Sequence, residues 1–140
     1  MVAARWNYTA LLGRILLGTI FLLSGFQKLT HWSQTAALMH SKGLPMVPVM
    51  LAITILIEIG AAILMIIGWH ARWAALIMFL YMIPVTLVFH NFWASPPDQK
   101  MMQTMNFLKN LGIMGGLLQV YALGIGRATS EERLGPRVAA

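Results

Sequence analysis

The sequence contains no cysteine, and only 10% of its 140 residues are charged. The absence of cysteine excludes disulfide bonds, thiol catalysis, iron–sulfur clusters and thiolate zinc sites. An ordinary soluble domain carries about 25% charged residues. Here 59% of the residues are hydrophobic, too many for polar groups to cover the surface. We therefore expect lipid to surround most of this protein.

Four apolar segments are long enough to cross a hydrocarbon core of about 30 Å, which takes about 20 helical residues. Their apolar runs are continuous and do not alternate, so they indicate helices and not strands. The sequence therefore predicts an all-α integral membrane protein, a four-helix transmembrane bundle over residues 1–126 with a polar C-terminal tail over 127–140. No small-residue cleavage site follows the first segment, so we expect it to be retained. The predicted spans are 8–29, 47–69, 73–92 and 107–126.

The connections between these spans differ in character. Residues 30–46 combine polar residues with apolar ones at near-helical spacing, which predicts a short amphipathic helix between spans one and two. Residues 70–72 form a tight turn, so spans two and three should be antiparallel neighbours. Residues 94–106 are polar and predict a solvated loop. The apolar residues of the amphipathic helix are Trp32, Ala36, Leu38 and Met39.

The net charge of +6 comes from basic residues scattered at the ends of the apolar runs. This distribution favours anionic lipid headgroups as partners and gives no reason to expect nucleic-acid binding. Every arginine falls on the side of both termini and every lysine on the other. By the positive-inside rule, we expect a multi-pass protein of a bacterial inner membrane with cytoplasmic termini.

Glu58 is the residue least expected in this sequence, because it lies near the middle of span two between isoleucines. At 1.5 Å per residue it is roughly 15 Å from either membrane surface, so it must be paired or protonated. Arg14 lies closer in depth than Lys109, and we predict a structural Arg14–Glu58 ion pair. Three roles remain open for Glu58. The pair could fix the docking of spans one and two, Glu58 could act catalytically in proton transfer or ligand contact, or it could be a tolerated, protonated acid.

A second polar group is expected at the ends of spans one, three and four, which meet in an antiparallel bundle. Such a pocket could bind a quinone headgroup, a small anion or a lipid phosphate. Alternatively these residues are interfacial anchors whose lysines extend to water. The histidine spacings give no indication of a metal or haem site. The candidate ligand-binding residues are Lys28, His90, Asn91, Lys109 and Asn110.

Read in order, several short blocks resemble the DoxX family of small bacterial membrane proteins. The resemblance covers residues 10–126 and lapses in the tail, where Gly124-Ile125-Gly126 replaces the family's Gly-Pro-Gly element. It implies a four-helix membrane bundle and a link to redox chemistry, since some members are subunits of quinone-reducing thiosulfate oxidoreductases and others associate with oxidative-stress enzymes. The blocks are Arg14-Ile-Leu-Leu-Gly18, Ser24-Gly25-Phe-Gln-Lys28-Leu29, Gly43-Leu-Pro45, Ile57-Glu58-Ile-Gly60, Gly68-Trp-His-Ala-Arg72, Phe89-His90, Asn106-Phe107-Leu-Lys109-Asn110 and Gly115-Gly116.

Three functions are consistent with these observations. The first is a membrane subunit of an oxidoreductase assembly, with quinone as the candidate cofactor and an oxidoreductase as the partner protein. It would be an enzyme only as part of such an assembly. The second is a small proton-coupled transporter that uses Glu58 at mid-membrane depth. The third is a scaffold without chemistry of its own. A homodimer through Gly112 and Gly116 is a further candidate, although packing within one chain is the favoured role of these glycines.

Overall fold

The computed structural model describes residues 8–125, and these form helices joined by short turns. Helix α1 spans Tyr8–Thr30 and the short α2 spans Trp32–Ser41. A continuous helix follows, made of α3 (Val47–Leu56), the π-helix η1 (Ile57–Ala61) and α4 (Ala62–Ile67). Helix α5 spans Ala71–Phe89, the 3-10 turn η2 spans Phe92–Ala94, and α6 spans Pro97–Leu123.

The all-helical membrane fold predicted from the sequence is confirmed. Within residues 8–125, three helical stretches are long and apolar enough to cross a membrane: Tyr8–Thr30, Val47–Ile67 and Ala71–Ala94. The fourth predicted span lies in α6. This helix is long enough, at 27 residues, but polar side chains make it less apolar than the other three.

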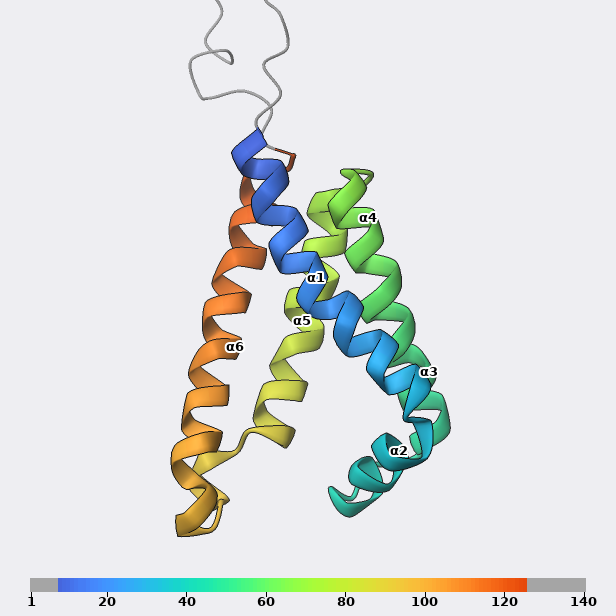
Figure 1. The fold of residues 1–140 in the computed structure, drawn as a ribbon, viewed down its shortest axis with the longest axis vertical. Coiled ribbons are helices and arrows are strands. Elements are labelled where there is room, and N and C mark those ends of the chain that lie inside the picture. The colour runs from blue at the N-terminus through green and yellow to red at the C-terminus, as the bar shows by residue number, and fades with distance from the viewer. Residues whose placement is uncertain (1–7, 126–140) are drawn as a thin grey trace, which may run out of the picture.

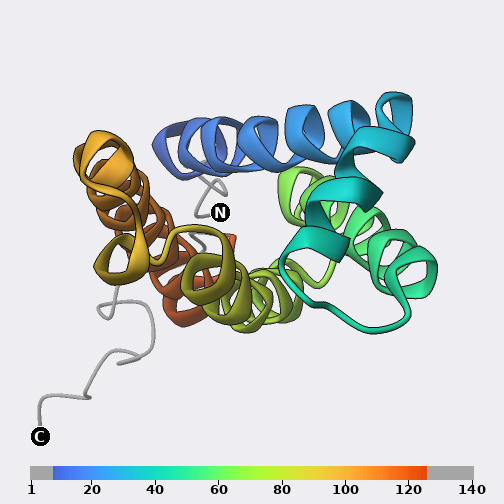
Figure 2. The ribbon, with the colours of Figure 1, turned by 90° about the horizontal axis from the view of Figure 1, so that it is seen from below.

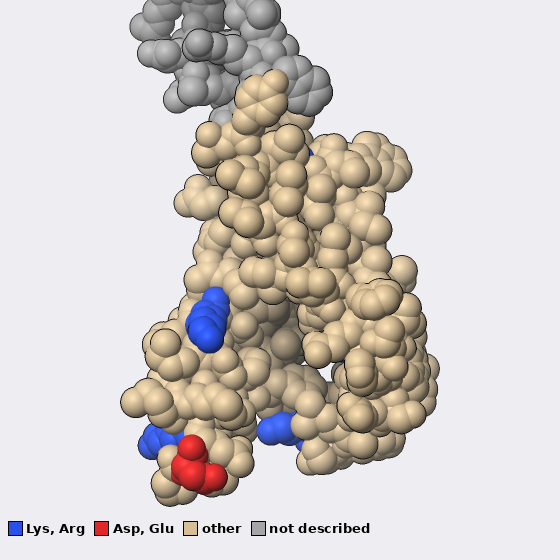
Figure 3. All heavy atoms as spheres, viewed as in Figure 1, with Lys and Arg blue, Asp and Glu red and all other residues tan. Residues whose placement is uncertain are grey.

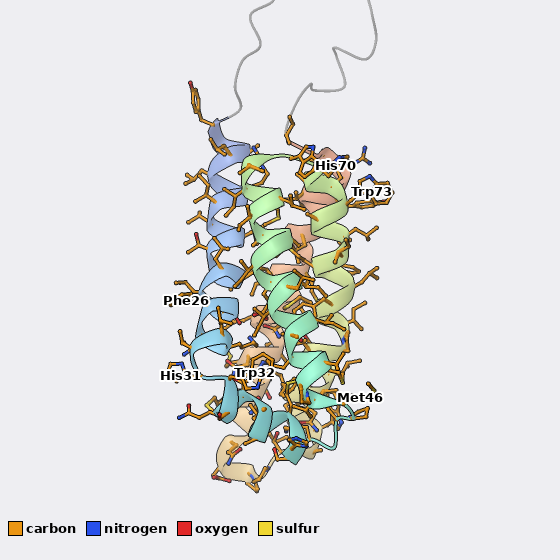
Figure 4. The ribbon with its side chains drawn as sticks, turned by 90° about the vertical axis from the view of Figure 1, so that its right-hand side faces the viewer. Phe26, His31, Trp32, Met46, His70 and Trp73 are labelled. Atoms are coloured by element: carbon orange, nitrogen blue, oxygen red, sulfur yellow. The ribbon has the colours of Figure 1, made fainter. Side chains whose placement is uncertain are left out.

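The helices define two ends of the molecule (Figure 1). The "termini end" holds the start of α1, the α4–α5 turn and the end of α6. The "α2 end" holds α2 and the α5–α6 connection. His70 and Trp73 lie at the termini end, whereas Trp32 and Met46 lie at the α2 end (Figure 4). Seen from the α2 end, α1 forms one side, α5 and α6 lie together on another, and α2 with α3 forms the third (Figure 2).

Small residues let the spans approach closely in the core. Ala62 and Ala75 are fully buried, and they pack in one cluster with Met65, Met78 and Leu117. The outward faces of the first three spans consist mainly of large aliphatic side chains, which suit contact with lipid. Examples are Leu12, Leu16, Ile20 and Leu23 on α1 and Ile77, Leu80, Ile83 and Leu87 on α5.

The amphipathic helix predicted between spans one and two is present as α2. Its Met39 is buried against Val47, Leu51 and Ile55 of α3. Contact with α3 therefore fixes α2 at this end of the bundle.

The predicted solvated loop over 94–106 is wrong for most of its length, because α6 already begins at Pro97. Proline is well suited to the first turn of a helix, where its missing N–H is not needed. Asp98, also in that turn, complements the positive end of the helix dipole. The polar tail predicted over 127–140 lies outside the described residues.

Candidate functional site: a buried ion pair where three helices meet

Glu58 lies in η1 and is only 4% exposed. Lys28 of α1 places its Nζ 3.1 Å from Oε1 and 3.0 Å from Oε2 of this carboxylate. Tyr81 of α5 donates its hydroxyl to Oε1 at 2.7 Å. Side chains from three spans therefore meet at one carboxylate. We call Lys28, Glu58 and Tyr81 the Glu58 cluster.

Lys28 reaches Glu58 because helical side chains slant toward the N-terminus of their helix. Its ammonium also donates to Ser24 Oγ, one turn earlier in α1. Gly25 lies at that level, and a Cβ atom there would come within 2.7 Å of Ile59 and 3.1 Å of Glu58 Cβ. The missing side chain at Gly25 is therefore what lets α1 approach η1 closely enough for the ion pair.

The backbone around Glu58 is a π-helix and not an α-helix. Such a segment contains one extra residue in its turn, and single π-turns inside α-helices occur frequently at functional sites. Glu58 could be singled out from the sequence because it is a charged residue in the middle of an apolar span. No sequence pattern indicated that the backbone around it is a π-helix.

The predicted Arg14–Glu58 pair does not form. Arg14 is buried, and its Nη1 donates to the carbonyl oxygens of Met65 at 3.0 Å and Ile66 at 3.3 Å. These carbonyls lie in the last turn of α4, where intrahelical partners are missing. The helix ends at Gly68, which has a positive φ of 84° and no Cβ to block the guanidinium. Arg14 therefore caps α4, while Lys28 pairs with Glu58.

The other candidate binding residues lie mainly between α5 and α6. His90 Nδ1 is 2.9 Å from Gln103 Oε1, and Asn110 Nδ2 donates to the buried Thr86 Oγ1 at 3.0 Å. Asn91 precedes η2 and is half-buried, whereas Lys109 is exposed on α6. Within residues 8–125, no hydrogen bond or ion pair joins Lys28 to this group. The residues expected to line one pocket therefore fall into two separate groups. Lys28 belongs to the Glu58 cluster, whereas His90 and Asn110 form hydrogen bonds between α5 and α6.

The molecular surface carries a hollow on one face. Figure 3 shows this face hollowed between α1 and α6, with very few charged side chains around the hollow. The two helices are close where Gly116 faces Leu17, at a distance that would bring a Cβ within 3.1 Å of the leucine. They diverge toward the α2 end (Figure 1). The Lys28 side chain is 26% exposed and that of Glu58 is 5% exposed. Lys28 is therefore the more accessible side chain of the pair.

The fold and the buried ion pair define a small multi-span α-helical membrane protein. The profile of the DoxX family matches residues 9–91, more than half of the chain, and the chain therefore belongs to the DoxX family.

Two relatives in Escherichia coli (strain K12) are similar over nearly their whole length. The inner membrane protein YphA is 30% identical over 123 residues, which cover 88% of each chain. The inner membrane protein YqjF is 32% identical over 124 residues, which cover 89% of each chain. No solved structure matches the chain. Both relatives agree with the predicted location in the bacterial inner membrane, whereas the orientation of the termini stays a prediction.

Proposed function

We propose that this chain is a membrane subunit of an oxidoreductase assembly and that the Glu58 cluster binds the headgroup of a quinone. The observation that carries the proposal is an ion pair at the mid-span π-helix, with its lysine accessible and its carboxylate buried. Ionisable residues inside a membrane are costly and mark ligand or proton pathways by default.

The charges of the cluster favour a neutral ligand over an anion. Lys28 and Glu58 compensate each other, so a buried anion would add an uncompensated negative charge. A ketone oxygen needs only hydrogen-bond donors. Two of the three ammonium hydrogens of Lys28 suffice for Glu58 and Ser24, which leaves one for a ligand.

The cluster could also move protons. A bound quinone would accept two electrons and two protons, and we propose that a partner oxidoreductase delivers the electrons. Lys28 would orient the accepting oxygen and Tyr81 would hold the carboxylate in place. Lys28 would donate a proton to the reduced oxygen, and a proton taken up from water would restore its ammonium by way of Glu58, through the contacts of 3.0 and 3.1 Å. A second round of the same transfer would supply the second proton.

The proposal is tested by the thermal stability of the purified full-length chain in mild detergent. We expect a short-chain quinone to raise the melting temperature, and an alcohol with the same tail but no quinone ring to leave it unchanged. Lys28→Met should abolish the shift, whereas Lys109→Met should keep it, because Lys109 lies exposed on α6. The ligand site would be rejected if quinone caused no shift or caused the same shift in the Lys28→Met variant.

A further inference from the structure

Helix α6 presents an outward face that differs from those of the other spans. Four of its exposed residues lie three or four positions apart, which places them on one side of a helix. We call Lys109, Gly112, Gly115 and Gln119 the α6 outer face. The outward faces of α1 and α5 consist mainly of large aliphatic residues, such as Leu16, Ile20, Leu80 and Ile83, and neither exposes a charged or amide side chain over residues 12–23 or 77–87. The exposed lysine and glutamine therefore set α6 apart, and they lie among aliphatic residues of the same helix such as Leu108, Leu111 and Leu118.

The α6 outer face lies at membrane depth. Near the α2 end, Asn110 donates to Thr86 of the α5 span. At the other end, Arg72 Nε donates to the carbonyl oxygen of Tyr121 at 2.7 Å, and its guanidinium lies 5.5 Å from the centre of the Tyr121 ring. The stretch of α6 between these two contacts therefore runs alongside a membrane span.

The polar groups of this face are not satisfied within the described part of the chain. No hydrogen bond or ion pair is formed there by the side chains of Lys109 or Gln119. A Cβ atom at Gly112 or Gly115 would meet no atom within 4 Å. These glycines therefore do not serve the packing of the four-helix bundle, and the face is open to an approaching helix.

From this contrast we infer that the α6 outer face binds a transmembrane helix of a different polypeptide, one that carries an aspartate or glutamate at the depth of Lys109. The lysine supplies the charge complementarity, because a cation facing lipid is costly and an in-span carboxylate neutralises it. Gln119 would form hydrogen bonds across the interface, and the glycines would allow close helix contact.

A second copy of this chain is the poorer occupant. A two-fold axis along α6 would bring Lys109 close to its own copy, and like charges repel. The described residues also offer no carboxylate that could pair with Lys109 across such a dimer, because Glu58 is buried in its own cluster. Asp98 lies eleven residues before Lys109, or roughly 16 Å along the helix. The inference deepens the subunit part of the proposed function and does not depend on the quinone site.

The test is site-specific photocrosslinking of the full-length chain in native membranes. Probes are placed at Leu108 and Ala122, which are exposed beside the α6 outer face, with control probes at Leu16 and Leu80. We expect the α6 probes to give one protein adduct at least about tenfold stronger than the controls give. The adduct should contain an integral membrane protein with a carboxylate in its span.

Three variants show whether the adduct depends on the α6 outer face. Gly112→Leu should abolish it without harming the fold, because a Cβ there meets nothing. Lys109→Glu should abolish it, and replacement of the partner's carboxylate by lysine should restore it, while Lys109→Arg should keep it. Adducts with lipid only, an adduct between two copies of this chain, or a partner adduct unchanged in Gly112→Leu and Lys109→Glu would overturn the inference. Quinone-dependent stabilisation of the chain would be unaffected by any of these outcomes.

Discussion

Both carboxylate oxygens of Glu58 lie within 3.1 Å of the Lys28 ammonium, although thirty residues separate the two positions in the sequence. The contact joins α1 to the π-helical segment of the second span. Because the carboxylate is almost fully buried, the two charges depend on each other.

Removing Lys28 should destabilise the protein more than removing both charges. Lys28→Met leaves a buried carboxylate with Tyr81 as its remaining bonded partner, and breaking a buried pair costs about 3–5 kcal/mol, at the lower end here because Lys28 is partly exposed. Adding Glu58→Gln should recover part of the loss. Equilibrium unfolding in mixed detergent micelles measures both free energies. A double variant no more stable than Lys28→Met would contradict a charge-pair origin.

Arg14 and Glu58 should behave as independent sites. Arg14→Met should cost about 1.5–3 kcal/mol, because the carbonyl oxygens at the end of α4 lose a charged donor. A double-mutant cycle should give an Arg14–Glu58 coupling energy below about 0.5 kcal/mol and a Lys28–Glu58 coupling energy above about 1 kcal/mol. The reverse order of the two couplings would restore the pairing first predicted from the sequence.

Gly25→Ala should destabilise the bundle by about 1–3 kcal/mol, because its Cβ would fall 2.7 Å from Ile59 and push α1 away from η1. Gly112→Ala is the matched control. Its Cβ meets nothing, and alanine favours a helix over glycine by about 1 kcal/mol, so this variant should be neutral or stabilised. Unfolding of both variants under one condition makes the comparison. Equal effects would mean that Gly25 is not a contact position.

Tyr81→Phe should weaken the Glu58 cluster without breaking the ion pair. The lost hydrogen bond to a charged acceptor is worth about 1.5–3 kcal/mol. The free energy of unfolding should fall by that amount in wild-type background and by clearly less in the Glu58→Gln variant. An identical loss in both backgrounds would show that the hydroxyl acts elsewhere.

The sequence was sufficient to predict the helical membrane fold, the α2 helix and the burial of Glu58 with a partner, because hydropathy and burial of charge act locally along the chain. It did not predict the correct partner of Glu58. Depth along the membrane normal favoured Arg14. The actual pairing depends on the contact of α1 with the second span at Gly25 and on the backward slant of the Lys28 side chain.

A physical reason for the position of Arg14 and Arg72 near the termini end also became clear only from the structure. Arg14 and Arg72 donate to carbonyl oxygens in the last turns of α4 and α6, and both of these helices end at the termini end. A guanidinium suits unpaired carbonyls at a helix C-terminus. No local pattern in the sequence could reveal these contacts, because they join residues about fifty positions apart.

The most direct test of the proposed function is photolabelling of the protein in native membranes with a photoreactive quinone, followed by mapping of the labelled peptides. We expect labelling around Lys28 and Tyr81 that excess unlabelled quinone suppresses and that Lys28→Met removes. Labels confined to other helices, or labelling at Lys28 that excess quinone does not suppress, would contradict a quinone site at the Glu58 cluster.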